Sequence, residues 1–366
     1  MASFEVPVLR VDRIEDHPNA DALEIAVVRG YCCVIKIGAH QPGDLVAYIP
    51  EDAIVPEELL RAMRLWDEAK GRGMLAGQRG DRVKAIRLRG IVSQGLLHPV
   101  EGRAPGEDLA TELDIVKYEP EIPVHMQGEV CQVRGHTLSY DVESLQKHPD
   151  LLVEGEEVVF TEKLHGTFTG FGFDPGLSHP QLLDGGTLIS SKGLADTGFA
   201  FQWNEANASN LYVMAFRAAL LETGAWDRVR AECSRTGQPL FVLGETFGKK
   251  VQDLHYGQQG RSFRVFDIYV GQPRRGRFLD YDDMVAKAKA LGLEPVPRLY
   301  RGPYSLAAAE AHRDGKTTLR GKHVREGIVI SPVHERECPD LPCNRLKLKF
   351  VSPKYLLRRG RVTDFN

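Results

Sequence analysis

Short runs rich in Val, Ile and Leu recur through the first 115 residues, and clusters of turn-forming residues separate them. The runs occupy residues 6–11, 23–29, 32–37, 45–49, 83–88 and 95–98. Between them lie segments rich in Asp, Asn, Gly and Pro, at residues 16–21, 41–44 and 77–81. Apolar runs of this length, bounded by turn residues, are typical of β-strands. Residues 1–115 are therefore predicted to fold as a small β-barrel.

The rest of the chain mixes helical and extended patterns. Residues 116–130 are rich in charged and turn-forming residues, including Glu-Pro-Glu-Ile-Pro at 119–123, and predict a linker. We expect helices near residues 210–221 and 281–290, and strands near residues 241–243, 263–269 and 327–330. This order favours an antiparallel α+β domain over residues 131–366 rather than a doubly wound parallel sheet.

Composition agrees with a two-domain globular protein. The 366 residues suffice for two cores, and 42% hydrophobic with 27% charged residues is ordinary for such chains. No apolar run approaches the roughly 20 residues that span a bilayer, and residues 1–7 lack the pattern of a signal peptide. We therefore expect a cytoplasmic protein that does not associate with membranes.

The net charge of -3 argues against general coating of a nucleic acid, but the charge is uneven. Residues 345–361 contain seven Lys or Arg residues and no Asp or Glu. Such a segment predicts a surface that faces phosphates, although an isolated basic run is also typical of a solvated helix.

The six cysteines show no spacing typical of a disulfide framework or a zinc ribbon, so we expect reduced thiols. His334, Cys338 and Cys343 are close enough in sequence to share a metal, but their spacing is not that of the usual zinc fingers.

One lysine stands out in the segment Glu162-Lys163-Leu164-His165-Gly166-Thr167. Residues 158–160 and 168–173 read as strands on either side, so we expect Lys163 to lie between two strands of one sheet. Burial there should lower its pKa from the ordinary value of ~10.4 and favour the nucleophilic free amine. Taken alone, the segment equally fits a surface lysine at the end of a strand.

Four further segments follow in the C-terminal half: Gly244-Glu245, Phe266-Asp267-Ile268, residues 326–330 (Glu-Gly-Ile-Val-Ile) and Lys347-Leu348-Lys349. In order and approximate spacing, the five segments resemble motifs I, III, IIIa, IV and V of the ATP-dependent polynucleotide ligases and their mRNA-capping relatives. The resemblance implies a nucleotidyltransferase domain with two antiparallel sheets and the nucleotide between them. No phosphate-binding loop of the Walker A type is present, so separate cations must contact the phosphates.

The resemblance also implies roles for individual residues. Lys163 is expected to attack ATP and carry AMP, with His165, Lys347 and Lys349 as further catalytic residues. Glu245 and Glu326 are the expected ligands of Mg²⁺ or Mn²⁺, because these hard cations prefer carboxylate oxygens. The expected nucleotide contacts are Glu162, Gly166, Lys192, Glu245, Phe266, Glu326 and Lys347.

Three of these assignments have structural alternatives. Lys347 and Lys349 alternate on a strand and so point the same way, as two lysines of a solvated strand edge also would. Phe266 is expected to stack on the adenine, but its neighbours Val265 and Ile268 read as core residues, which makes a core phenylalanine the rival interpretation. Glu245 and Glu326 could equally be surface carboxylates.

The N-terminal barrel carries a second resemblance. Residues 17–23 (His-Pro-Asn-Ala-Asp-Ala-Leu), with 41–44 and 91–97, resemble the tRNA-binding OB modules of some aminoacyl-tRNA synthetases, an arrangement that also heads the Deinococcus-type RNA ligases. We predict contacts with nucleic acid from the neighbouring basic residues Arg82, Lys84, Arg87 and Arg89. Strand alternation would place Arg87 and Arg89 on one face, along a phosphate backbone, although an exposed basic strand without a ligand fits the same pattern.

The combination of Lys-Leu-His-Gly-Thr with a preceding OB module favours the Deinococcus-type RNA ligases, and with them ATP as cofactor and RNA or an RNA-containing nicked duplex as partner. Phe168 departs from the asparagine that nick-sealing phage ligases carry, and neither His165 nor Phe168 fits the DNA ligase pattern. Two alternatives stay open: an RNA-binding accessory protein with an inactive transferase-like domain, and a capping-type or DNA-ligase-type nucleotidyltransferase. Nothing in the sequence requires a partner subunit, so we expect a monomer that acts in RNA repair.

Overall fold

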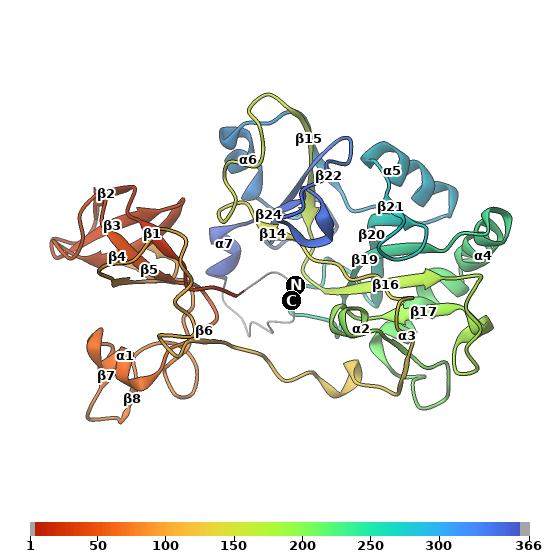
Figure 1. Cartoon of the computed structure of the whole chain (residues 1–366), viewed down its shortest axis with the longest axis horizontal. Coiled ribbons are helices and arrows are strands. Elements are labelled where there is room, and N and C mark those ends of the chain that lie inside the picture. Colours follow the sequence, from red (N-terminus) through yellow and green to blue (C-terminus); the bar gives the residue numbers. More distant parts are fainter. Residues whose placement is uncertain (1–3, 359–366) are drawn as a thin grey trace. The chain divides into compact units, whose positions relative to one another are not determined.

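The computed structural model describes residues 4–358, so Arg359 and Arg361 of the predicted basic run lie outside the described residues. Contacts divide these residues into an N-terminal unit, residues 4–119 with 356–358, and a C-terminal unit, residues 120–355 (Figure 1). None of the described helices is long and apolar enough to cross a membrane.

The N-terminal unit is built from short antiparallel strands, as the apolar runs predict. One sheet has the order β1 (Val8–Arg10), β5 (Leu45–Ile49), β11 (Leu96–Pro99), and a second the order β2 (Arg13–Asp16), β3 (Leu23–Val28), β4 (Tyr31–Lys36). Three strand pairs complete the unit: β9 (Ile86–Leu88) with β10 (Ile91–Ser93), β6 (Ala53–Ile54) with β12 (Val116–Lys117), and β7 (Trp66–Asp67) with β8 (Arg72–Gly73). A single short helix, α1 (Glu57–Ala62), lies between β6 and β7. Apolar side chains of these strands form the cores of the unit.

The C-terminal unit contains two five-stranded sheets, which we call sheet A and sheet B. Sheet A has the order β14 (Glu143–Ser144), β24 (Leu348–Val351), β23 (Gly327–Pro332), β15 (Glu157–Lys163), β22 (Arg298–Pro303). Sheet B has the order β17 (Thr187–Ser190), β16 (Thr167–Phe173), β19 (Leu240–Gly248), β20 (Arg261–Val270), β21 (Arg277–Phe278). All pairings are antiparallel except that of β14 with β24, so the predicted antiparallel α+β architecture is confirmed.

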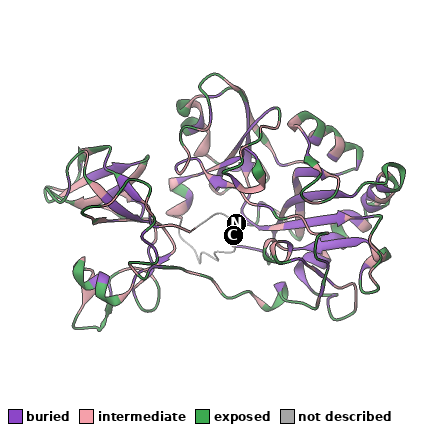
Figure 2. Ribbon diagram, viewed as in Figure 1, coloured by how far each residue is buried: buried purple, intermediate pink, exposed green. Residues whose placement is uncertain are grey.

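Helices cover one face of each sheet. Sheet B packs its apolar side chains against α3 (Leu211–Phe216), α4 (Ala225–Thr236) and α5 (Tyr281–Ala290), while sheet A packs against α6 (Leu306–Arg313). Figure 2 shows the strands mostly buried and the outer sides of these helices exposed. The predicted helix at 210–221 is present as α3 and a π-helical turn, Arg217–Leu221, and Asn210 caps it by accepting bonds from the backbone N–H groups of Tyr212 and Val213.

The remaining elements are short. They comprise α2 (Lys192–Thr197), α7 (Pro353–Leu356), the strand pair β13 (Val130–Gln132) and β18 (Phe199–Phe201), and 3-10 turns at Val124–Met126, Leu183–Gly185 and Pro342–Asn344. Ser191 caps α2, and its hydroxyl accepts a bond from Leu194 N–H.

The expectation that Lys163 lies between two strands of one sheet is wrong. Lys163 ends β15 in sheet A, and the chain then crosses through residues 164–166 to β16 in sheet B. Gly166 makes the crossing possible, because a Cβ atom there would lie 2.2 Å from the carbonyl oxygen of Thr246 on β19. The segment therefore joins the two sheets instead of forming a hairpin within one of them.

Candidate active site

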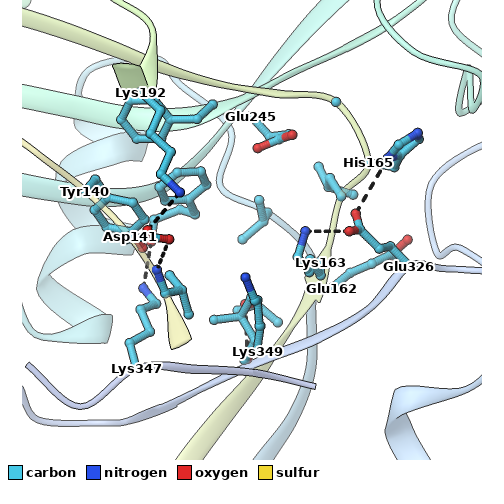
Figure 3. Close-up of a pocket in the computed structure, with 18 residues that line it drawn as sticks. Tyr140, Asp141, Glu162, Lys163, His165, Lys192, Glu245, Glu326, Lys347 and Lys349 are labelled. Atoms are coloured by element: carbon cyan, nitrogen blue, oxygen red, sulfur yellow. Dashed lines mark hydrogen bonds and ion pairs between the residues drawn. The ribbon is translucent and has the colours of Figure 1, made fainter. Parts of the chain in front are cut away.

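A cavity of about 890 Å³, counted with its space open to solvent, lies between sheets A and B (Figure 3). All ten residues predicted for catalysis or nucleotide contact line it: Glu162, Lys163, His165, Gly166, Lys192, Glu245, Phe266, Glu326, Lys347 and Lys349. The pleat explains this convergence in sheet A. Val158 and Phe160 pack toward α6, so the alternate residues Thr161 and Lys163 face the cavity.

Lys163 is paired with a carboxylate in this structure. Its Nζ lies 2.6 Å from Oε1 of Glu326, which precedes β23 (Figure 3). Burial alone would lower the pKa of Lys163, but the Glu326 and Glu245 carboxylates outweigh it, and the net pKa lies above the ordinary value. The sequence-based expectation of a lowered pKa is therefore wrong for the ligand-free protein, because partners from distant segments reverse the effect of burial.

Glu245 behaves differently from Glu326. Burial raises the pKa of Glu245 to about 8, with Lys163 opposing and Glu326 reinforcing the rise. Glu326, and not Glu245, forms the ion pair with Lys163.

Lys349, unlike Lys163, has a lowered pKa. It lies next to Val329 in the register of β23 and β24, on the face of sheet A that carries Lys163. Burial and the charge of Lys163 lower the pKa of Lys349 to about 8, although Asp141 opposes the shift. Among the described residues no carboxylate pairs with it, so its amine is available to a ligand in the cavity.

Lys347 belongs to a buried ion cluster that links the sheets. Its Nζ lies 2.7 Å from Oδ2 of Asp267 on β20, and Arg345 Nη1 lies 3.1 Å from the same oxygen. Burial and Arg345 lower the pKa of Lys347, while Asp267 opposes the shift. The sequence analysis did not identify Arg345 or Asp267 as site residues, although Asp267 directly follows Phe266 and Arg345 alternates with Lys347.

Polar contacts hold the turn after Lys163 in place. The His165 ring lies 2.6 Å from Asp253 Oδ1 through Nε2 and 2.8 Å from the Tyr355 hydroxyl through Nδ1. Because Asp253 is a hydrogen-bond acceptor, Nε2 carries a proton, and in the neutral ring Tyr355 then donates to Nδ1. The neighbouring Glu162 side chain also lines the cavity but is only 1% exposed. Its carboxylate accepts bonds from the N–H and the hydroxyl of Thr318 and so holds the loop that contains Thr318.

An aromatic wall forms the opposite side of the cavity. Tyr140 stacks on Phe266 at 5.0 Å and on Phe168 at 5.6 Å between ring centroids. Phe266 is the extra residue of a β-bulge, since Leu243 faces Asp267 and Gly244 faces Val265 across β19 and β20. The bulge lets Val265 and Ile268 enter one core while the half-buried Phe266 lines the cavity and packs against the edge of a second core.

Tyr140 and Asp141 were missed by the sequence analysis. The Tyr140 hydroxyl donates to Asp267 at 2.5 Å, and Asp141 lies 2.8 Å from Lys192 Nζ. Both precede β14 in a segment without a distinctive pattern, so only the fold reveals their place beside the cavity.

The carboxylates of the site fit a divalent cation. Glu326 Oε2 is buried without a hydrogen-bond partner among residues 4–358, and Glu245 faces the same cavity. Within those residues no three His, Cys, Asp or Glu side chains gather to hold a metal on their own, which also excludes a site shared by His334, Cys338 and Cys343. One or two carboxylates with substrate phosphates is the usual arrangement for Mg²⁺.

The basic residues of the N-terminal unit differ from the prediction. Arg82 is 7% exposed, its guanidinium bonds Asp52 and it stacks on Tyr118 at 3.6 Å. Arg87 and Arg89 do not share a strand face, because β9 ends at Leu88 and Arg89 occupies the following turn with a φ of 45°. Both remain exposed, and Lys84 is half-buried.

Comparison with known proteins identifies the family. The sequence model described as RNA ligase matches residues 156–349, and one for an OB-fold domain matches residues 6–100. No curated protein matches the chain significantly.

Solved structures of the Naegleria gruberi RNA ligase share the fold. An apo mutant is 23% identical with a TM-score of 0.73, over 97% of this chain and 98% of the other. The enzyme with PPi is 24% identical with a TM-score of 0.72, over 97% and 98% of the two chains. A mutant with ATP and Mn is 23% identical with a TM-score of 0.71, over 96% and 98%. Because the family's sequence model covers more than half of its residues, the chain belongs to the RNA ligase family.

Proposed function

We propose that this RNA ligase joins a 3'-hydroxyl end to a 5'-phosphate end and uses ATP through an AMP adduct on Lys163. The observation that carries this proposal is the position of the Lys163 amine, held by Glu326 in a cavity with Lys347, Lys349 and an aromatic wall. Cations, an aromatic face and a nucleophile are what a nucleoside triphosphate requires of such a site.

The first step transfers AMP to the enzyme. Lys163 gives up its ammonium proton, for which Glu326 Oε1 at 2.6 Å is the nearest acceptor. The free amine then attacks the α-phosphorus of ATP, so that a P–N bond forms as the bond to pyrophosphate breaks. Lys349 neutralises charge on the phosphoryl oxygens, and Phe266 with Tyr140 supports the adenine.

The next two steps use the stored AMP. An oxygen of the RNA 5'-phosphate attacks the phosphorus bound to Lys163, which releases the amine and leaves an adenylylated 5' end. The 3'-hydroxyl then attacks the 5'-phosphate, and AMP departs as the phosphodiester forms. Bound Mg²⁺ or Mn²⁺ would neutralise phosphoryl charge, and we propose Glu326 and Glu245 as its protein ligands.

We further propose the Deinococcus type of RNA ligase, because Lys-Leu-His-Gly-Thr occurs together with an OB module placed before the transferase unit. Glu162, Gly166 and Lys192 are proposed nucleotide contacts, and His165 is proposed to act beside Lys163. The exposed Arg87 and Arg89, with Lys84, are the proposed RNA contacts of the N-terminal unit. A role in RNA repair, a cytoplasmic location, a monomeric state and the domain bounds 1–115 and 131–366 stay predictions.

The test is covalent labelling with α-labelled ATP and Mn²⁺ or Mg²⁺. We expect acid-labile label on the wild-type protein and none on Lys163→Ala, whereas Lys192→Ala should keep Lys163 reactive but need more ATP. Equal labelling of Lys163→Ala would refute the assignment of the nucleophile. Labelling by GTP in place of ATP would indicate a capping-type enzyme, and strong RNA binding without any label would indicate an accessory protein.

A further inference from the structure

Two loops of the C-terminal unit carry an excess of exposed basic residues. The loop between β19 and β20, residues 249–260, and the loop between α6 and β23, residues 314–326, together expose Lys249, Lys250, Lys316, Arg320 and Lys322. None of the five forms an ion pair with a carboxylate of residues 4–358. We call this set the basic loop pair.

The two loops pack against each other as one surface. The Tyr256 and His323 rings meet edge to face at 4.5 Å. Gly257, with a φ of 70°, lies so close to Arg320 that a Cβ atom would be 2.9 Å from the Arg320 carbonyl oxygen. The two basic loops are therefore packed against each other.

The basic loop pair is also fastened to the turn that carries Lys163. Tyr256 accepts a bond from His165 N–H at 2.6 Å, Gln252 donates to the Gly166 carbonyl at 3.2 Å, and Asp253 bonds the His165 ring. From the second loop, Thr318 donates twice to Glu162. The acidic Asp253 is thus occupied by His165, and the exposed charges that remain near the turn are positive.

We propose that the basic loop pair docks the phosphodiester backbone of the RNA strand whose end reacts at Lys163. The inference rests on the proposed function, because it names the surface that delivers the RNA to the adenylated lysine. A polyanion is the partner that matches five unpaired cations on a chain with a net charge of -3. The backbone must also pass close to the Lys163 turn if its 5'-phosphate is to reach the bound AMP.

The chain offers a matched control for this surface. Lys249-Lys250 lies before the start of β20, and the equally exposed pair Arg274-Arg275 lies beyond its other end, in the turn before β21. The ten residues of β20 separate the two pairs by roughly 33 Å. Lys249→Glu/Lys250→Glu and Arg274→Glu/Arg275→Glu therefore make the same change of charge at different places.

The experiment measures the Kd of a short 5'-phosphorylated RNA by fluorescence anisotropy over a range of salt, without ATP. We expect Kd to rise at least about tenfold at low salt in K249E/K250E and in R320E/K322E, and less than about threefold in R274E/R275E. The slope of log Kd against log salt should fall by roughly 0.7 for each RNA phosphate that no longer pairs with a cation.

Labelling with α-labelled ATP is run on the same proteins. Loop variants that are labelled as strongly as the wild type but bind RNA more weakly would support docking of RNA on these loops. An unchanged Kd in the loop variants, or an equal rise of Kd in R274E/R275E, would overturn the proposal. Loop variants that bind RNA normally but take up no label would also overturn it, because that result would assign the loops to the ATP phosphates. Absence of label on the wild type would contradict the proposed function, and the Kd comparison would still decide whether these loops bind RNA.

Discussion

At the scale of single residues, the cavity holds two lysines whose pKa values shift in opposite directions. Lys163 is buried beside two carboxylates and its pKa is raised, whereas burial and its cationic neighbours lower the pKa of Lys349 to about 8. The proposed nucleophile is thus stored as an ammonium ion. To react as a nucleophile it must first lose that proton, for which Glu326 Oε1 is the nearest acceptor.

Glu326→Gln is expected to make Lys163 reactive at lower pH in the absence of nucleotide. A hydrogen bond to a charged group is worth about 1.5–3 kcal/mol, which corresponds to about one to two pH units. Because a raised pKa keeps the amine protonated as the pH rises, removal of its cause lowers the midpoint of reaction. The midpoint can be measured by mass spectrometry after treatment with a small amine-reactive reagent across a pH series.

Glu245→Gln is the comparison for this variant. It should shift the midpoint less, since the hydrogen bond to Lys163 comes from Glu326 alone. A midpoint in Glu326→Gln equal to or above that of the wild type would contradict the role assigned to the ion pair.

At the scale of elements, the site depends on how sheets A and B are joined. The chain itself crosses from β15 to β16 at Gly166, and Asp267 of β20 binds Arg345 and Lys347 before β24. Tyr140 adds a third donor to Asp267. This buried cluster holds Lys347 beside Phe266, to whose carbonyl oxygen Lys347 Nζ donates at 3.3 Å.

Asp267→Asn is expected to lower the free energy of unfolding by about 3–5 kcal/mol at pH 7, because it leaves two buried cations with less compensation. Burial alone would raise the pKa of Asp267, but Arg345 and Lys347 outweigh it and the net pKa is lowered. Its stabilisation is therefore complete above the unfolded pKa of ~3.9 and is lost as the pH falls through the folded value. Urea unfolding at several pH values should show the difference from wild type shrinking in acid.

Asp282→Asn serves as the control for the buried cluster. Asp282 pairs with Arg301 on the surface with 59% of its side chain exposed, so its removal should cost at most about 1 kcal/mol. Equal effects of the two variants, or a difference for Asp267→Asn that does not change with pH, would argue against the cluster as a link between the sheets.

The elements were largely predictable because their signals are local. The strands at 241–243, 263–269 and 327–330 and the helix at 281–290 appear where apolar periodicity predicts them. What the sequence could not provide is contact between distant segments. The pKa of Lys163 depends on Glu326, 163 residues away, and the pairing of Arg82 depends on Asp52, 30 residues away. Tyr140 and Asp141 lack any local signal, so only the fold places them at the cavity.

At the scale of the whole molecule, a chain with a net charge of -3 has to concentrate its contacts with RNA in local patches. The N-terminal unit offers the β9–β10 hairpin, where Arg87 and Arg89 are exposed on either side of Leu88. The loop at residues 17–19 holds this hairpin. The Asn19 side chain donates to the Arg89 carbonyl oxygen, and His17 Nε2 lies 3.2 Å from the Leu88 carbonyl oxygen. These two contacts therefore fix the backbone of the hairpin that carries Arg87 and Arg89.

Arg87→Glu/Arg89→Glu should weaken binding of 5'-phosphorylated RNA and leave covalent labelling by α-labelled ATP within about twofold of wild type. The reason is that phosphate contacts contribute affinity and salt dependence, whereas AMP transfer uses groups of the C-terminal unit. We expect Kd at low salt to rise about tenfold and the salt slope to fall by roughly 0.7 for each phosphate that these arginines neutralise in the wild type.

Arg13→Glu is the control, because Arg13 is exposed on β2 but already bonds Glu15. If both variants bind RNA as the wild type does, the hairpin is not an RNA contact, and absence of label in Arg87→Glu/Arg89→Glu would mean that the N-terminal unit takes part in AMP transfer.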